Sequence, residues 1–187
     1  MKEYRSAIRS RNLIKKAFIE LVAKKEVGKI TVVDIVNAAD ISRNTFYAHY
    51  SDVFAVLEDI ENGAIARLNA YLDEAIAKRQ FYNPLPLLQN FQKFIENNME
   101  YFRVLLLNKN AYGFCEKIKN IVIKRVFDNL GDVSIKDTEG FMVLLECIAG
   151  GYIDFVRMSL KGEVEYTLSD ITHRINDIFV NGIKLYC

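Results

Sequence analysis

Apolar residues recur along this chain at the spacing of a helix, and alternation of apolar and polar residues is nowhere sustained. Near the N-terminus the recurring apolar positions are Ile14, Ala17, Phe18, Leu21 and Val22. Basic residues lie mostly on the other side of the helical wheel. The pattern predicts an amphipathic helix that ends near residue 28, and it favours an all-α fold for the whole chain.

Residues suited to helix ends divide the rest of the chain. Thr31 and Asp34 resemble a capping box, in which the acid replaces the usual Glu or Gln. Ser42 and Ser51 are suitable N-caps for two further helices. Caps and apolar spacing together predict later helices over about 32–39, 43–49, 52–78, 85–97, 99–108, 112–130, 136–161 and 168–185, with a connection at 80–86 and breaks at 40–41, 131 and 162–166. We therefore expect about nine helices in all.

The net charge of +1 is unevenly distributed. Residues 1–50 hold ten Lys and Arg against five Asp and Glu, which gives +5, whereas residues 51–187 hold fifteen against nineteen, which gives −4. A basic N-terminal part on an acidic remainder is typical of a DNA-binding domain joined to a domain that does not bind DNA. A solvated basic first helix would produce the same imbalance.

Several classes of protein are disfavoured by the sequence. The N-terminus lacks the apolar core of a secretory signal, and no apolar stretch approaches the ~20 residues of a membrane span. Cys115, Cys147 and Cys187 form no disulfide or zinc pattern, and the first two are expected to be small core residues. The two histidines, His49 and His173, are too far apart in the chain to suggest a triad or a metal site. We expect a cytoplasmic protein that is not an enzyme, binds no metal or cofactor and does not associate with a membrane.

Residues 31–50 have the pattern of a DNA-reading helix pair. Such a pair needs apolar residues on its inner face and hydrogen-bonding groups outside, because side chains must reach base edges in the major groove. The inner face is supplied by Val32, Ile35, Val36, Ala39, Ile41 and Phe46. The residues expected to be exposed are Ser42, Arg43, Asn44, Thr45, Tyr47, His49 and Tyr50.

In residue type and spacing, the run from Ile30 to Tyr50 resembles the DNA-binding domain of TetR-family regulators. The likeness covers about residues 8–60 and is strongest to the branch typified by the regulator of dihydroxyacetone kinase genes. The resemblance implies a dimer that binds a palindromic double-stranded DNA operator. It implies a helix-turn-helix DNA-binding domain over 1–50, a connecting helix over 51–79, and a helical regulatory and dimerisation domain over 80–187.

Roles for individual residues follow from the same resemblance. Arg43 and Asn44 would read bases, whereas Thr31 would contact phosphate. The other DNA-contact candidates are Ser42, Thr45, Tyr47, His49 and Tyr50. Packing is the alternative for Tyr47 and Tyr50, and capping of its own helix is the alternative for His49.

Two positions depart from the family pattern. Asp40 stands where a turn glycine is usual, and Asp tolerates the left-handed backbone better than most residues. Val53 replaces a phosphate-binding lysine that many relatives have just inside the fourth helix. One phosphate contact is therefore in doubt.

Residues 80–187 are rich in aromatic side chains, which can fill a core or line a ligand cavity. In the second case Tyr101, Arg103, Tyr152 and Asp154 would orient a small-molecule inducer that releases a repressor. Control by a protein partner and a helical adaptor without DNA affinity are the alternatives. A homodimer through 136–161 and 168–185 is expected, because these segments carry much apolar surface, namely Phe141, Leu144, Leu145, Ile148, Ile171, Ile175, Ile178 and Phe179.

Overall fold

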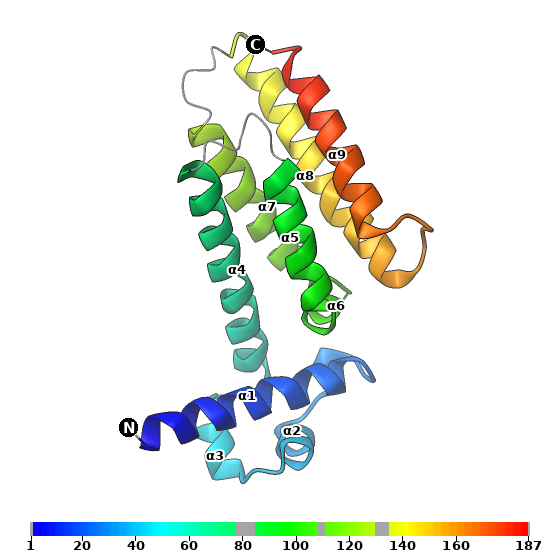
Figure 1. Cartoon of the computed structure of the whole chain (residues 1–187). Coiled ribbons are helices and arrows are strands. Elements are labelled where there is room, and N and C mark those ends of the chain that lie inside the picture. The colour runs from blue at the N-terminus through cyan, green and yellow to red at the C-terminus, as the bar shows by residue number, and fades with distance from the viewer. Residues whose placement is uncertain (1, 78–84, 108–110, 130–134, 187) are drawn as a thin grey trace. The chain divides into compact units, whose positions relative to one another are not determined.

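The computed structural model describes residues 2–77, 85–107, 111–129 and 135–186, and the regular structure in this part of the chain is entirely helical. Figure 1 labels the elements. In chain order they are α1 (Lys2–Val22), η1 (Val27–Lys29), α2 (Val32–Ala39), α3 (Arg43–Tyr47), α4 (Val53–Ala77), α5 (Leu85–Asn97), α6 (Met99–Leu107), α7 (Ala111–Asp128), α8 (Thr138–Lys161) and α9 (Leu168–Ile183). The all-α prediction is confirmed. The first helix ends earlier than expected, because residues 27–29 form a separate 3-10 turn.

The chain folds as two compact units. The head unit comprises Met1–Ala64 and Glu100–Lys109, and the body unit comprises Ile65–Met99 and Asn110–Cys187. The long helix α4 begins in the head unit and ends in the body unit. The proposed linker at 80–86 and the break at 131 fall largely outside the described residues.

The head unit is built around a small set of fully buried side chains. Ile14 and Phe18 of α1, Ile35 of α2 and Phe46 of α3 are each 0% exposed. Helix α1 packs along α2, and α2 contacts α3, as Figure 1 shows in blue and cyan. The apolar face predicted for α1 is therefore the face that packs on α2.

Helix α2 begins at the predicted capping box. The backbone N–H of Asp34 donates to Thr31 Oγ1 at 3.2 Å, and the backbone N–H of Thr31 donates to Asp34 Oδ2 at 2.7 Å. Lys25 Nζ lies 2.6 Å from the same carboxylate oxygen. These contacts supply partners for backbone donors that the first turn of a helix leaves unpaired.

The turn between α2 and α3 depends on Asp40, which adopts the left-handed conformation with φ 52° and ψ 52°. The expectation that Asp tolerates this position is confirmed. Ser42 then caps α3, since its Oγ accepts from the backbone N–H of Thr45 at 3.0 Å. The predicted cap of α4 is wrong: Asp52 rather than Ser51 accepts from the N–H of Ala55, at 2.9 Å.

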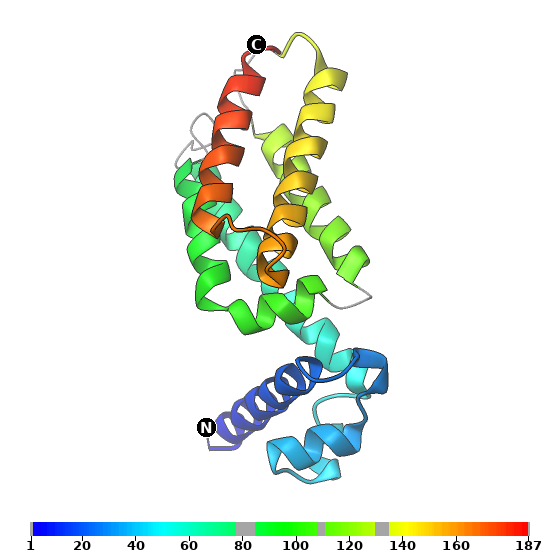
Figure 2. The same ribbon diagram turned by 90° about the vertical axis from the view of Figure 1, so that its right-hand side faces the viewer.

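The body unit centres on α8 and α9, which lie side by side in both views, with α7 against α8 and α5 against α9 (Figures 1 and 2). Gly162 ends α8 in the left-handed conformation, with φ 73°. The apolar surface expected between subunits lies largely inside this unit instead. The side chains of Phe141, Leu145, Ile171, Ile175 and Phe179 are at most 7% exposed, because they pack on neighbouring helices of the same chain.

Another set of residues forms the outer row of α8 and α9. Val143 is 61% exposed, Phe155 43% and Ile178 53%, and Cys147 is also exposed. The expectation that Cys147 is a core residue is therefore wrong, whereas Cys115 is buried as expected. Within the described ranges, no helix combines the length and the apolar character needed to cross a bilayer.

The capping box of α2 makes the stability of the folded chain depend on pH in a measurable way. Hydrogen bonds from Lys25 and from Thr31 lower the pKa of Asp34 to about 2. In the unfolded chain the pKa is about 3.9. The stabilisation that ionised Asp34 gives to the folded chain is therefore complete above the pKa that Asp34 has in the unfolded chain. It is lost as the pH falls through about 2. We expect Asp34→Asn to flatten the dependence of the urea unfolding midpoint on pH between about 4 and 2.

The exposed acid Glu58 offers a matched control, since it lies on α4 outside the capping box. Glu58→Gln should leave the slope as it is in the wild-type chain. Equal slopes in the wild-type chain and in Asp34→Asn would contradict the electrostatic role of this box.

Candidate DNA-binding site

Helix α3 is held from one side only. It has five residues, and of these Phe46 is 0% exposed. The ring of Tyr47 meets that of Phe46 edge to face, with centroids 5.5 Å apart. Arg43, Asn44 and Tyr47 of the same helix are exposed, so their side chains lie where the core does not cover α3.

The outward side chains of α3 are polar and available. Arg43 and Asn44 are exposed, and within the described ranges neither side chain has a hydrogen-bond or ion-pair partner. Tyr47 is 57% exposed. An exposed guanidinium, an amide and a phenol on one short helix form a surface that can donate to base edges and phosphates.

Three other candidates are engaged in local hydrogen bonds. Ser42 Oγ lies 2.9 Å from Thr45 Oγ1, and both atoms belong to the cap of α3. Thr31 is exposed, but its hydroxyl donates to Asp34 Oδ2 at 2.7 Å. These residues order the starts of α2 and α3, and a phosphate contact would have to share or displace these bonds.

His49 and Tyr50 make contacts inside the head unit, with residues of α1 and α4. His49 is half-buried, and its Nε2 lies 2.7 Å from Ser10 Oγ of α1. Tyr50 is 4% exposed and donates its hydroxyl proton to Asp59 Oδ2 at 2.7 Å. Burial, with the hydrogen bond to Asp59, raises the pKa of Tyr50 well above its usual value. The expected exposure of Tyr50 is therefore wrong, and the alternative of a packing residue describes it.

Ser10 and Asp59, which hold His49 and Tyr50, were not among the residues predicted for this site. Each lies far along the chain, or on another helix, from the residue that it contacts. Neither belongs to the apolar periodicity, so the pattern carries no signal for them. Val53 is 7% exposed and packs in the core, so its side chain does not take the place of the missing lysine at the surface.

The body unit contains an apolar cavity of about 130 Å³. Helices α4, α5, α7, α8 and α9 all contribute to it, and its lining is almost entirely apolar. Representative lining residues are Leu72, Phe91, Val122, Ala149, Tyr152 and Phe179. Of the four predicted ligand residues, Tyr152 alone lines this cavity.

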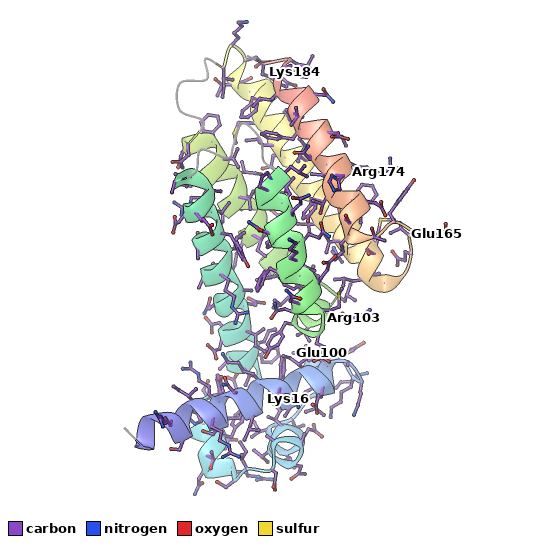
Figure 3. The ribbon with its side chains drawn as sticks, in the orientation of Figure 1. Lys16, Glu100, Arg103, Glu165, Arg174 and Lys184 are labelled. Carbon is purple, nitrogen blue, oxygen red and sulfur yellow. The ribbon has the colours of Figure 1, made fainter. Side chains whose placement is uncertain are left out.

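The other three predicted ligand residues lie elsewhere. Arg103, which Figure 3 labels, and Tyr101 are exposed on α6. Asp154 is exposed on α8, where its Oδ1 lies 3.6 Å from Arg157 Nη1. Helix α6 contributes no residue to the described cavity lining, and Asp154 lies on the exposed side of α8. Tyr152 itself is buried, with its hydroxyl 3.2 Å from Thr172 Oγ1, and burial raises its pKa to about 12.

Lys119 is the one cation of the described cavity lining, and its charge is already compensated. Its Nζ lies 2.9 Å from Glu116 and 3.0 Å from Glu146. These hydrogen bonds raise the pKa of the ammonium group. The cavity therefore offers a ligand shape and apolar contact, without an unpaired charge. The described ranges contain no grouping of His, Cys, Asp and Glu that could hold a metal ion.

Comparison with known proteins places this arrangement in a known class. No family model matches the chain. It is 31% identical over 78 residues to the uncharacterized HTH-type transcriptional regulator YxbF of Bacillus subtilis (strain 168), which covers 41% of this chain. The chain covers only 20% of the length of that protein.

Solved structures match almost the whole chain. A helix-turn-helix head joined to a helical body is the class that the fold defines. The dihydroxyacetone kinase operon activator DhaS superposes with a TM-score of 0.69 and 20% identity, over 95% of this chain and 97% of that one. A TetR transcriptional regulator from Streptococcus agalactiae 2603V superposes with a TM-score of 0.67 and 20% identity, over 96% and 98%. The chain has the fold of the TetR regulators, as its sequence suggested.

Proposed function

We propose that this chain is a DNA-binding transcriptional regulator, a homodimeric repressor that a small-molecule inducer releases from its operator. The observation that carries the proposal is the outward face of α3, where Arg43 and Asn44 are exposed and have no partner within the described chain. The basic N-terminal part of the sequence supports it, because positive charge favours the phosphate backbone.

Base reading and phosphate holding can be separated within α3. Arg43→Ala should cost about 1–3 kcal/mol of binding to a specific duplex and relax the preference at one base pair of each half-site, because a guanidinium can bind guanine through two hydrogen bonds. Tyr47→Phe should weaken binding to all sequences about equally, because a phosphate contact carries no sequence information. Both variants are measured by fluorescence anisotropy on a selected and on a scrambled duplex, at two salt concentrations.

Both side chains are exposed, so thermal melting should be unchanged and serves as the control. An equal loss on both duplexes in Arg43→Ala would show that Arg43 does not read bases. If the wild-type chain fails to bind even random duplex at low salt, the alternative of a helical adaptor is the correct one.

The outer row of α8 and α9 supports a homodimer through 136–161 and 168–185. Val143, Cys147 and Phe155 lie four and eight residues apart, so they share one face of α8. Ile178 is exposed on the adjacent α9. Around Gly150 and Gly151 of α8 there is open space where side chains would begin, so a partner helix could approach closely. An apolar row of this kind is suited to a two-fold symmetric interface.

We expect Ile178→Glu to shift the chain from dimer to monomer in light scattering at micromolar concentration, because a symmetric interface would bury the new charge twice. Asn120→Glu, on the exposed side of α7, adds the same charge elsewhere and should leave a dimer. A wild-type chain that is monomeric at this concentration would refute the interface.

The cavity of the body unit supports a small, uncharged, apolar inducer. Its volume is about 130 Å³, and engineered apolar cavities of about 150 Å³ bind benzene. Toluene should therefore bind and weaken operator affinity at least about tenfold, equivalent to ~1.4 kcal/mol of coupling. Benzoate, which has the same ring and a charge, should have no effect, because the lining offers it no free cation.

Ala149→Leu tests the location, since Ala149 lines the cavity and a larger side chain would occupy the space. This variant should bind the operator and ignore toluene. A wild-type chain whose DNA affinity responds to no apolar compound would favour control by a protein partner instead.

A further inference from the structure

The segment directly after α3 is fastened to the rest of the head unit by two polar contacts. His49 Nε2 lies 2.7 Å from Ser10 Oγ, and Tyr50 donates to Asp59 Oδ2 at 2.7 Å. Ser10 belongs to α1 and Asp59 to α4. Neighbouring residues of one short segment are thereby held by two different helices.

Asp59 is the centre of the larger of these contacts. Besides the hydroxyl of Tyr50, its Oδ2 lies 2.7 Å from Lys15 Nζ and 3.3 Å from Arg11 Nε. Lys15 and Arg11 are one turn apart on α1, and Arg11 also lies over the ring of Tyr50, with its guanidinium carbon 5.7 Å from the ring centroid. One carboxylate on α4 therefore joins α1 to the end of the α3 segment.

The contact is partly sheltered from solvent, although the side chain of Arg11 is 52% exposed. The side chains of Lys15 and Asp59 are each 23% exposed, and Tyr50 is buried. Burial raises the pKa of Asp59, but the hydrogen bonds from Lys15 and Tyr50 and the nearby charges outweigh it and lower the pKa overall. Asp59 is thus held in the charged form, which strengthens its hydrogen bonds.

Helix α3 needs such a contact because it is short. Five residues span about 7.5 Å, and Phe46 is the only one of them that is buried. One buried ring fixes the distance of a helix from the core better than it fixes the rotation of the helix about that ring. Tyr50, whose ring centroid is 6.0 Å from that of Phe46, adds a second anchor, and Asp59 determines where that anchor lies.

We propose that Asp59 is a positioning residue for DNA reading: through Tyr50 and α1 it fixes the orientation in which α3 presents Arg43 and Asn44. This inference rests on the proposed function. Asp59 touches no base in this scheme. Its effect is on selectivity, because a bidentate contact to a base edge tolerates less misplacement than an ionic contact to phosphate.

Asp59→Asn should change the affinity for the specific duplex in two opposite ways, one electrostatic and one through the positioning of α3. Removing a negative charge from a DNA-binding protein strengthens its attraction to phosphate, so electrostatics alone would raise affinity for every duplex. Loss of positioning would lower affinity for the specific duplex. Glu58→Gln, the adjacent exposed acid on α4, removes the same charge without touching Tyr50 and is the matched control.

The test uses the full-length chain and a duplex enriched by the wild-type chain from a random-sequence library, with a scrambled duplex of equal composition. We expect Asp59→Asn and Tyr50→Phe each to lower affinity for the enriched duplex about tenfold, within the range for one bidentate base contact. Affinity for the scrambled duplex should stay equal or rise. Glu58→Gln should keep the ratio of the two affinities unchanged.

The double variant separates positioning from general loss of stability. Tyr50→Phe removes the hydrogen bond between the two residues, and Asp59→Asn removes the charge that strengthens it. Because both substitutions act on one interaction, the double variant should lose little more selectivity than either single variant. Thermal melting by circular dichroism is recorded for each, and Tyr50→Phe keeps the buried ring if Asp59→Asn proves unstable.

The outcomes are distinct. If the wild-type chain enriches a duplex and both single variants retain its affinity ratio, Asp59 has no positioning role, while the proposed function stands. Equal losses on both duplexes would also overturn the positioning role. If the wild-type chain enriches no duplex, the proposed function fails and the positioning role fails with it.

Discussion

Burial of Phe46 is the constraint on which the geometry of the candidate DNA-binding surface depends. A helix of five residues is too short to be stable by itself, so α3 exists because its one apolar ring is covered by the head core. The core leaves Arg43 and Asn44 of this helix exposed, so their side chains are presented on the outside of the head unit. The Ser42 cap and the left-handed Asp40 set where the helix begins.

Polar contacts fix the orientation of α3, which apolar burial alone does not specify. Apolar packing is non-directional, so it holds α3 against the core without specifying every angle. Hydrogen bonds are directional, and the two that follow α3, at His49 and Tyr50, reach different helices. The described lining of the cavity in the body unit is almost entirely apolar, and its cation Lys119 is paired with Glu116 and Glu146. The cavity can therefore select a ligand by its shape and by apolar contact.

Much of the local structure could be predicted from sequence, because local structure depends on neighbours in the chain. The capping box at Thr31, the cap at Ser42 and the spacing of α1 each involve residues within a few positions of one another. The failures involve contacts across the fold. Tyr50 was expected at the surface, yet a partner on α4 and the core of the head unit cover it. Cys147 was expected in the core, yet it lies on the outer row of α8.

The sequence alone determined the helices, their order and the class of fold, because apolar periodicity and helix caps depend on residues that are close together in the chain. Only the tertiary structure decided which apolar residues of α8 and α9 face inward, and which polar residues lie near the cavity. The burial of Phe141 and the exposure of Val143 differ by two positions on one helix. Helical periodicity groups residues into faces, but which face is covered depends on the helices that pack against it.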